Sequence, residues 1–141
     1  MDSSDLTSQM VFDRAFLAID GIKNDMQKII AYYDDSVRES ILWEQMITGS
    51  VDDAMKAGEI IPFIQAQVTS DGKVRGGECL IRWDHRTKGM LPPGKFIGVL
   101  EKTGLIARVD RYMWEYACKI LGRWNEEGYD DMYLSVNIST S

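Results

Sequence analysis

Three polar side chains in this sequence, Gln65, Glu78 and Asn137, could supply oxygen atoms to one metal site. Each lies in a stretch whose alternation of apolar and polar residues is typical of a β-strand. Because side chains in a strand alternate between the two faces of a sheet, all three can point to a common face. Carboxylate and amide oxygens, without any His or Cys ligand, suit hard cations such as Mg²⁺, Mn²⁺ or Ca²⁺.

The strand that carries Glu78 also carries Leu80 and Arg82 at even spacings, which predicts that these three side chains share one face. A guanidinium group there would offer paired donors to a phosphate. An alternative stays open at this point: Glu78 forms an ion pair with Arg82 near the strand end, Asn137 caps a turn, and neither does chemistry. The lone His85 has no second His or Cys near it, so it is predicted to be a polar loop residue rather than a metal ligand.

The elements that position these residues follow from hydrophobic periodicity. A hairpin is predicted from strands 60–68 and 74–83 around the turn Ser70-Asp71-Gly72-Lys73. A short helix is predicted to open at Pro92-Pro93 and stop at Gly104, and a longer one to cover about 107–127. The last element, 132–139, alternates as a strand and carries Asn137 on its polar face. The chain is therefore expected to be an α/β protein.

The N-terminal third reads differently, with helical spacing of apolar residues over 11–24 and a short apolar run, Ile29 to Tyr33, that predicts a strand. Ser36 with Glu39 fits a capping box that would begin a helix over 37–56, with a possible interruption at Gly49-Ser50. A change in composition near 49–58 places a boundary between a helical part and an α/β part.

Composition excludes several classes of function. The 141 residues carry a formal net charge of -6, which argues against a protein that holds nucleic acid by its phosphates. No apolar run approaches the length of a membrane span, and the N-terminus lacks the features of a signal peptide. We therefore expect a cytoplasmic protein with no membrane contact in this segment. Cys79 and Cys118 are expected to be reduced, buried thiols.

Together these residues resemble a known family. The stretch 54–139 is similar to the first part of an EAL domain, the family of cyclic di-GMP phosphodiesterases. The motifs that carry the resemblance are Glu78-Cys79-Leu80, Arg82-Trp83, Pro93 with Phe96-Ile97, Thr103-Gly104-Leu105-Ile106, Ala117-Cys118, Trp124, and Val136-Asn137 with Ser139. The resemblance implies a (β/α)₈ barrel with one strand reversed, so the fold expected here is an incomplete TIM-barrel-like EAL domain with an N-terminal helical extension.

The segment before this stretch looks like the last helix and strand of a GGDEF domain running into a connecting helix, although it contains no GGDEF motif. The organisation expected from both resemblances is a GGDEF-like tail over 1–35, a connecting helix over 36–53 and the N-terminal part of an EAL domain over 54–141.

The resemblance also implies roles for single residues. Glu78 and Asn137 match ligands of a catalytic Mg²⁺ or Mn²⁺ ion, and Gln65, Leu80 and Arg82 match positions that contact the dinucleotide. The implied reaction is hydrolysis of cyclic di-GMP to the linear dinucleotide. Three positions depart from the family pattern: Ala66 and Arg86 each stand where a Pro is usual, and Cys79 replaces an Ala.

The family's remaining acidic metal ligands and its catalytic Lys belong to later segments, and a complete barrel needs about 250 residues. We therefore expect that this chain alone binds no metal and does not hydrolyse cyclic di-GMP. The alternative is a non-catalytic module for cyclic di-GMP sensing or for oligomerisation. In either case the unpaired edge of the strand 132–139 predicts a homodimer or strand exchange.

Overall fold

A computed structural model describes residues 3–139, and the chain divides into two compact units, Met1–Trp43 and Glu44–Ser141. The elements in chain order are α1 (Ser3–Ala57), β1 (Ile60–Val68), β2 (Val74–His85), β3 (Gly89–Leu91), the 3-10 turn η1 (Pro93–Lys95), α2 (Ile97–Thr103), α3 (Ile106–Glu126) and β4 (Tyr133–Val136). Helices and strands are mixed as predicted, and the four described strands are part of an incomplete TIM-barrel-like arrangement.

The N-terminal helix α1 is continuous, which confirms helix over 11–24 and 37–56 but corrects three details of the prediction. The strand predicted at Ile29 to Tyr33 is wrong, the helix has no break at Gly49-Ser50, and Ser36 lies inside the helix rather than at its start. A short apolar run fits a strand and a helix equally well, and no Gly or Pro stands between residues 22 and 48 to end the helix. The domain boundaries proposed at 35 and 53 stay predictions.

Along the first unit, α1 exposes large apolar side chains, among them Phe12, Phe16, Ile19, Ile22 and Ile29. Despite this apolar content, none of the helices described is both long and apolar enough to cross a membrane.

The sheet of the second unit is built around β2. It pairs antiparallel with β1 over the predicted hairpin, whose turn contains Gly72 at a φ of 83°. On the opposite side, β2 pairs antiparallel with β3 and parallel with β4. The predicted last strand is confirmed in part: ladder pairing covers only Tyr133–Val136, because the chain leaves the sheet just before Asn137.

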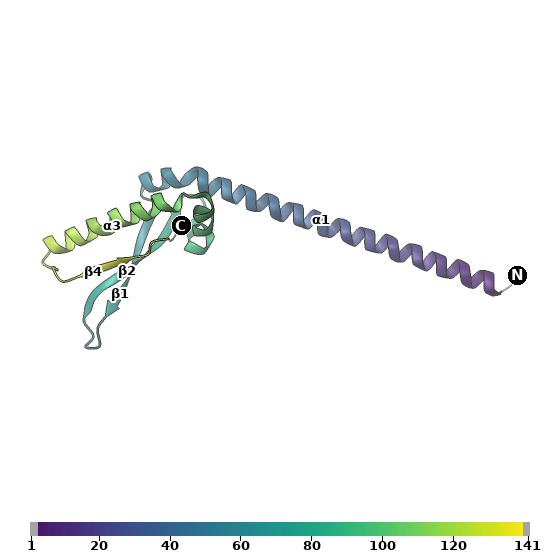
Figure 1. The fold of residues 1–141 in the computed structure, drawn as a ribbon, viewed down its shortest axis with the longest axis horizontal. Helices are drawn as coiled ribbons and strands as arrows, with labels where there is room; N and C mark the ends of the chain where they lie inside the picture. Colours follow the sequence, from purple (N-terminus) through teal and green to yellow (C-terminus); the bar gives the residue numbers. More distant parts are fainter. Residues whose placement is uncertain (1–2, 140–141) are drawn as a thin grey trace. The chain divides into compact units, whose positions relative to one another are not determined.

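The core lies between one face of this sheet and the helices, and Figure 1 shows α3 running beside β2 and β4. The longer predicted helix is confirmed as α3. The shorter one is confirmed in part: Pro93–Lys95 forms the 3-10 turn η1, and α2 begins only at Ile97 and is ended by Gly104 at a φ of 76°. At the centre of the core, the rings of Trp83 and Phe96 meet edge to face with centroids 5.5 Å apart. The largest fully buried side chains are Trp83, Phe96, Ile47, Ile60, Leu100, Val51 and Val109.

Strands β2 and β4 approach each other closely at Gly76. A Cβ at this position would lie 2.2 Å from the carbonyl oxygen of Tyr133 and 2.8 Å from the Cγ of its ring. Such contacts are far below van der Waals distance, so only glycine allows β4 to pair with β2 here. Gly76 thus determines how near the strand that leads to Asn137 comes to the strand that carries Glu78.

Candidate functional site

The predicted site residues share the face of the sheet opposite the core. Gln65 of β1 lies directly across from Glu78 of β2, and Glu78 lies beside Ser135 of β4. Directly paired residues place their side chains on the same face, and Leu80 and Arg82 follow Glu78 at even spacing. Asn137 follows Ser135 in the same way. The prediction that these side chains share one face is confirmed.

The closest contact within this set joins Glu78 and Asn137. The side-chain amide of Asn137 donates a hydrogen bond from Nδ2 to Oε1 of Glu78 at 3.1 Å. Glu78 is half-buried and Asn137 is exposed, so water reaches the pair. The alternative of a Glu78–Arg82 ion pair is wrong for the described residues, since the guanidinium of Arg82 has other partners.

Arg82 is half-buried and is held by two contacts near its own strand. Its Nη1 donates to the backbone carbonyl of Ile81 at 2.8 Å, and its Cζ lies 5.6 Å from the centroid of the Phe63 ring. A guanidinium over an aromatic face is attracted by the ring quadrupole. Phe63 lies across from Leu80 and remains 45% exposed, so it belongs to the site face. The alternation that places Gln65 on this face also places Phe63 there, two residues away, but the sequence predicted no contact between Phe63 and Arg82.

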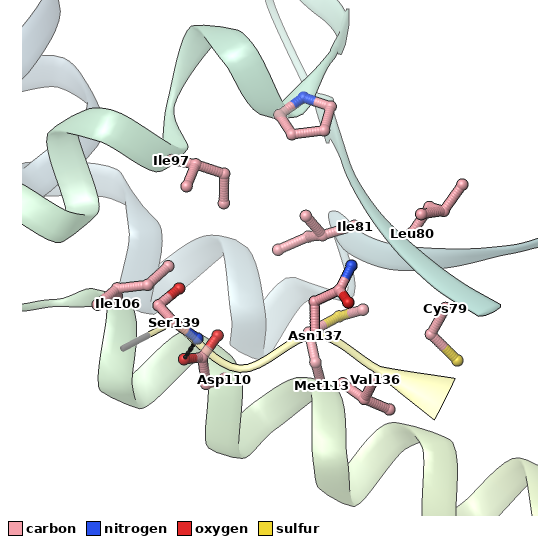
Figure 2. A pocket seen from close by; sticks show the side chains of 11 residues that line it. Cys79, Leu80, Ile81, Ile97, Ile106, Asp110, Met113, Val136, Asn137 and Ser139 are labelled. Atoms are coloured by element: carbon pink, nitrogen blue, oxygen red, sulfur yellow. Dashed lines mark hydrogen bonds between the residues drawn. The ribbon is translucent and has the colours of Figure 1, made fainter. Parts of the chain in front are cut away.

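A cavity of about 210 Å³ lies where β4 ends, between the sheet and helices α2 and α3. Its walls are largely apolar, with Cys79, Ile81 and Val136 from the sheet side. Asp110 of α3 and Ser139 also line it, and Figure 2 shows the carboxylate of Asp110 turned toward the backbone of Ser139. The backbone N–H of Ser139 donates to Oδ2 of Asp110 at 3.0 Å. Burial raises the pKa of the Cys79 thiol, which argues against a nucleophilic role.

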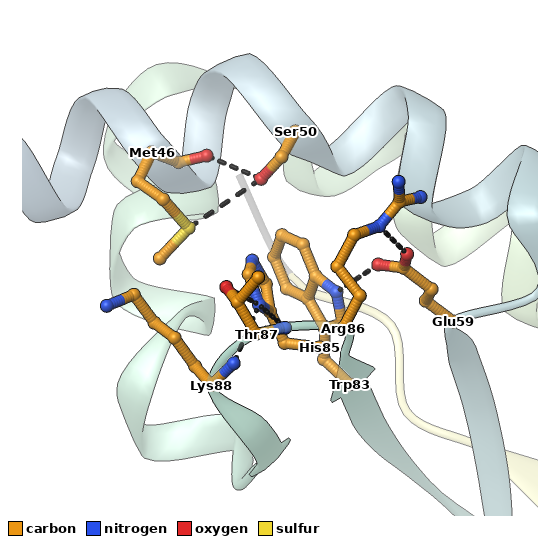
Figure 3. Close-up of polar contacts among 8 residues, drawn as sticks. All are labelled: Met46, Ser50, Glu59, Trp83, His85, Arg86, Thr87 and Lys88. Atoms are coloured by element: carbon orange, nitrogen blue, oxygen red, sulfur yellow. Dashed lines mark hydrogen bonds and ion pairs between the residues drawn. The ribbon is translucent and has the colours of Figure 1, made fainter.

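A second polar cluster lies at the other end of β2 and is shown in Figure 3. Glu59 accepts hydrogen bonds from Nε of Arg86 at 2.7 Å and from Nε1 of Trp83 at 3.2 Å. These two donors lower the pKa of the Glu59 carboxyl, with Arg86 the stronger cause. Arg86, which departs from the family pattern, thus has a structural contact here rather than a place on the site face.

His85 is buried at the end of β2 rather than in a loop, which corrects the prediction. Its Nδ1 accepts hydrogen bonds from the backbone N–H groups of Thr87 and Lys88, both at 3.2 Å. An Nδ1 that accepts two amide protons carries none, so the ring holds the turn after β2. Of the two cysteines, Cys79 is buried as predicted, whereas Cys118 is exposed on α3.

The donor chemistry of Glu78 and Asn137 fits a hard divalent cation, since both offer oxygen atoms and they already meet on one face. The fit is partial: within residues 3–139, no group of three or more His, Cys, Asp or Glu side chains is placed to hold a metal ion. Two protein ligands satisfy only part of the six that Mg²⁺ takes, and the remainder would come from water, substrate or other protein groups.

In this sheet β1 runs antiparallel to β2, β4 runs parallel to β2, and helices cover one face. This arrangement defines the class of protein as barrel-type α/β. The sequence model of the EAL domain matches residues 48–141, and the chain belongs to the EAL domain family. The match begins before residue 54, where the sequence resemblance began. The preceding segment that resembles a GGDEF tail has no such support and stays a prediction.

Two curated relatives show how much of a longer protein the chain resembles. The bifunctional diguanylate cyclase/cyclic di-GMP phosphodiesterase MucR of Pseudomonas aeruginosa is 27% identical over 109 residues, covering 77% of this chain and 16% of MucR. An uncharacterised protein of Mycobacterium tuberculosis is 32% identical over 109 residues, covering 76% of this chain and 36% of that protein. The chain therefore spans well under half the length of these relatives.

Solved structures agree with this assignment. The MucR phosphodiesterase in complex with c-di-GMP matches with a TM-score of 0.62 and 29% identity, over 67% of this chain and 38% of that one. The EAL domain of Xanthomonas citri FimX in complex with c-di-GMP matches with a TM-score of 0.62 over 72% of this chain and 39% of that one. Its identity of 18% supports the fold alone.

Proposed function

We propose that this chain supplies part of the catalytic site of a cyclic di-GMP phosphodiesterase, which hydrolyses the cyclic dinucleotide to its linear form. The observation that supports this most directly is the contact between Glu78 and Asn137, on the same sheet face as Gln65 and Arg82. The solved complex of the MucR phosphodiesterase with c-di-GMP, which is 29% identical to this chain, supports the substrate class.

In this proposal each residue has one role. Glu78 and Asn137 hold Mg²⁺ or Mn²⁺ through their oxygen atoms, and the ion, when bound, supplies Lewis-acid stabilisation of charge on the phosphate oxygens. Arg82 binds a phosphate through its guanidinium N–H groups. Gln65 donates and accepts hydrogen bonds at the dinucleotide, and Leu80 provides an apolar contact against it.

The 141-residue chain is expected to show no turnover by itself, because two oxygen ligands cannot assemble a two-metal hydrolytic site. The test is incubation of the purified chain with cyclic di-GMP and Mg²⁺ or Mn²⁺, followed by chromatography for the linear dinucleotide. Turnover that disappears in Glu78→Gln would contradict this part of the proposal. A contaminating hydrolase would instead give the same rate with both proteins.

A second candidate is non-catalytic sensing of cyclic di-GMP, and the exposed ring of Phe63 beside the half-buried Arg82 on the site face favours it. Titration calorimetry of the chain with cyclic di-GMP separates the two candidates. Saturable heat that is lost in Arg82→Ala, without turnover, would establish sensing. Heat that is unchanged in Arg82→Ala would show binding elsewhere on the chain.

A homodimer or strand exchange through β4 is also proposed. Within residues 3–139, β4 pairs with β2 alone, so its other edge presents unpaired backbone groups. Light scattering at several protein concentrations tests this. A particle of 16.0 kDa at every concentration would argue against it.

A further inference from the structure

The segment that carries Asn137 is held from the core side of the sheet. Ladder pairing of β4 ends at Val136, so Asn137 and the two residues after it have no strand partner among the residues described. The backbone N–H of Ser139 nevertheless donates to Oδ2 of Asp110 at 3.0 Å, as the dashed line in Figure 2 shows. This contact joins α3 to the chain two residues beyond Asn137.

Asp110 is well placed to act as an anchor. Its neighbours Val109 and Met113 are 1% and 4% exposed, so packing of α3 fixes the position of the residue between them. A carboxylate that accepts a backbone N–H forms a charge-assisted hydrogen bond, stronger than one between neutral groups. The Ser139 N–H that makes this hydrogen bond lies within about 8 Å of the Asn137 Cα, because consecutive Cα atoms are about 3.8 Å apart.

A direct role for Asp110 as a metal ligand fits the geometry less well. Its Oδ2 accepts a hydrogen bond from the Ser139 amide. Asn137 lines the same cavity as Asp110, but most of the other lining residues, among them Ile81, Met113 and Val136, are apolar. Glu78 projects from the opposite face of β2 toward Asn137. These contacts favour a role for Asp110 through the backbone of the chain over a role as a ligand of a shared ion.

We propose that Asp110 is a positioning residue, which holds the chain after β4 through the Ser139 amide and so keeps the Asn137 side chain against Glu78. The consequence for metal binding rests on the function proposed above. The positioning itself does not, because it concerns only protein groups.

The test compares removal of the donor with removal of the acceptor. Ser139→Pro lacks the backbone N–H, whereas its matched control Ser139→Ala retains it. Asp110→Ala lacks the acceptor, whereas Asp110→Asn keeps a neutral side-chain oxygen. Glu115→Ala is a further control, since it removes an acid of the same helix whose partner is the exposed Arg111.

The measurements are amide hydrogen exchange at Ser139 and the nuclear Overhauser contact between the Asn137 side-chain amide and Glu78. In Asp110→Ala, exchange at Ser139 should be about tenfold faster, and the Asn137–Glu78 contact should weaken. The contact should weaken equally in Ser139→Pro, be partly kept in Asp110→Asn, and be unchanged in Ser139→Ala and Glu115→Ala. An unchanged Asn137–Glu78 contact in Ser139→Pro would overturn the inference, even if Asp110→Ala fails to fold.

A third arm separates this inference from the proposed function. Its probe is Mn²⁺ alone at millimolar concentration, because two protein ligands hold an ion too weakly for the chain to retain it. Mn²⁺ should broaden the Asn137 amide signal of the wild-type chain by its paramagnetism. The same broadening should need more Mn²⁺ in Ser139→Pro than in the wild type, but no more in Ser139→Ala. If Mn²⁺ broadens neither Asn137 nor Glu78 in the wild type, the metal role in the proposed function fails. The exchange and contact data would still decide the positioning role of Asp110.

Discussion

Asn137 and Glu78, 59 residues apart in the chain, meet through a hydrogen bond of 3.1 Å between the amide Nδ2 and the carboxylate Oε1. The contact joins the end of β4 to the middle of β2 on the face away from the core. It places two oxygen-bearing groups where a divalent cation could replace the hydrogen bond. The proposed metal-binding role of this pair can therefore be tested by changing the charge of one partner.

Asn137→Asp should place a second carboxylate beside Glu78. In the absence of divalent cations, the two charges should lower the free energy of unfolding by about 1 kcal/mol at low salt, as for a pair near the surface. Mg²⁺ or Mn²⁺ should recover the loss, because a cation offsets both charges. Thermal melts with and without the ion measure this. Asn137→Ala is the control, and an equal response of both variants to the ion would contradict the prediction.

Phe63→Leu should release the guanidinium of Arg82, whose Cζ lies 5.6 Å from the ring centroid. The Nε–H signal of Arg82 should lose its ring-current shift, whereas Phe63→Tyr should keep it. In a double-mutant cycle with Arg82→Met, the coupling free energy of unfolding should be about 0.5–1 kcal/mol, as for exposed cation–π pairs. A coupling indistinguishable from zero would mean that the ring does not hold Arg82.

Gly76→Ala should destabilise the chain by about 1–3 kcal/mol, since the new Cβ would lie 2.2 Å from the carbonyl oxygen of Tyr133. Gly98→Ala in α2 is the matched control, because no atom lies within 4 Å of its Cβ position. That change should instead stabilise by about 0.5–1 kcal/mol through helix propensity. Urea unfolding of both variants gives the comparison. Equal effects would show that β4 does not press against β2 at Gly76.

Glu59→Gln should lower stability at neutral pH, because Arg86 and Trp83 stabilise the charged form of the carboxyl and lower its pKa. A lowered folded-state pKa gives stability that is present above the ordinary pKa and is lost as the pH falls through the folded value. The free energy of unfolding of Glu59→Gln should be about 1 kcal/mol below that of the wild type at pH 7. The difference is small because solvent screens the exposed Arg86, and it should shrink below about pH 4.

Unfolding curves between pH 3 and 7 measure this difference. Glu126→Gln, which also replaces an acid by its amide but at the exposed end of α3, is the control. A Glu59→Gln difference that persists unchanged at pH 3 would mean that the carboxylate charge contributes nothing.

Residues within a single element were predicted well from local pattern. The alternation around Glu78 and the helical spacing over about 107–127 each report the period of one strand or helix, and the structure confirms both. The run Ile29 to Tyr33 was predicted wrongly because five apolar residues carry no period that separates strand from helix.

The sequence by itself determined the family, the order of the hairpin and helices from residue 60 onward, and the common face of Gln65, Glu78 and Arg82, because these follow from local spacing and motif. Only the tertiary structure decided which groups meet. Asn137 rather than Arg82 became the partner of Glu78, and Asp110 came to hold Ser139. Such contacts depend on how closely separate elements pack. Gly76 and the core under α3 determine this packing, and no local sequence pattern predicts it.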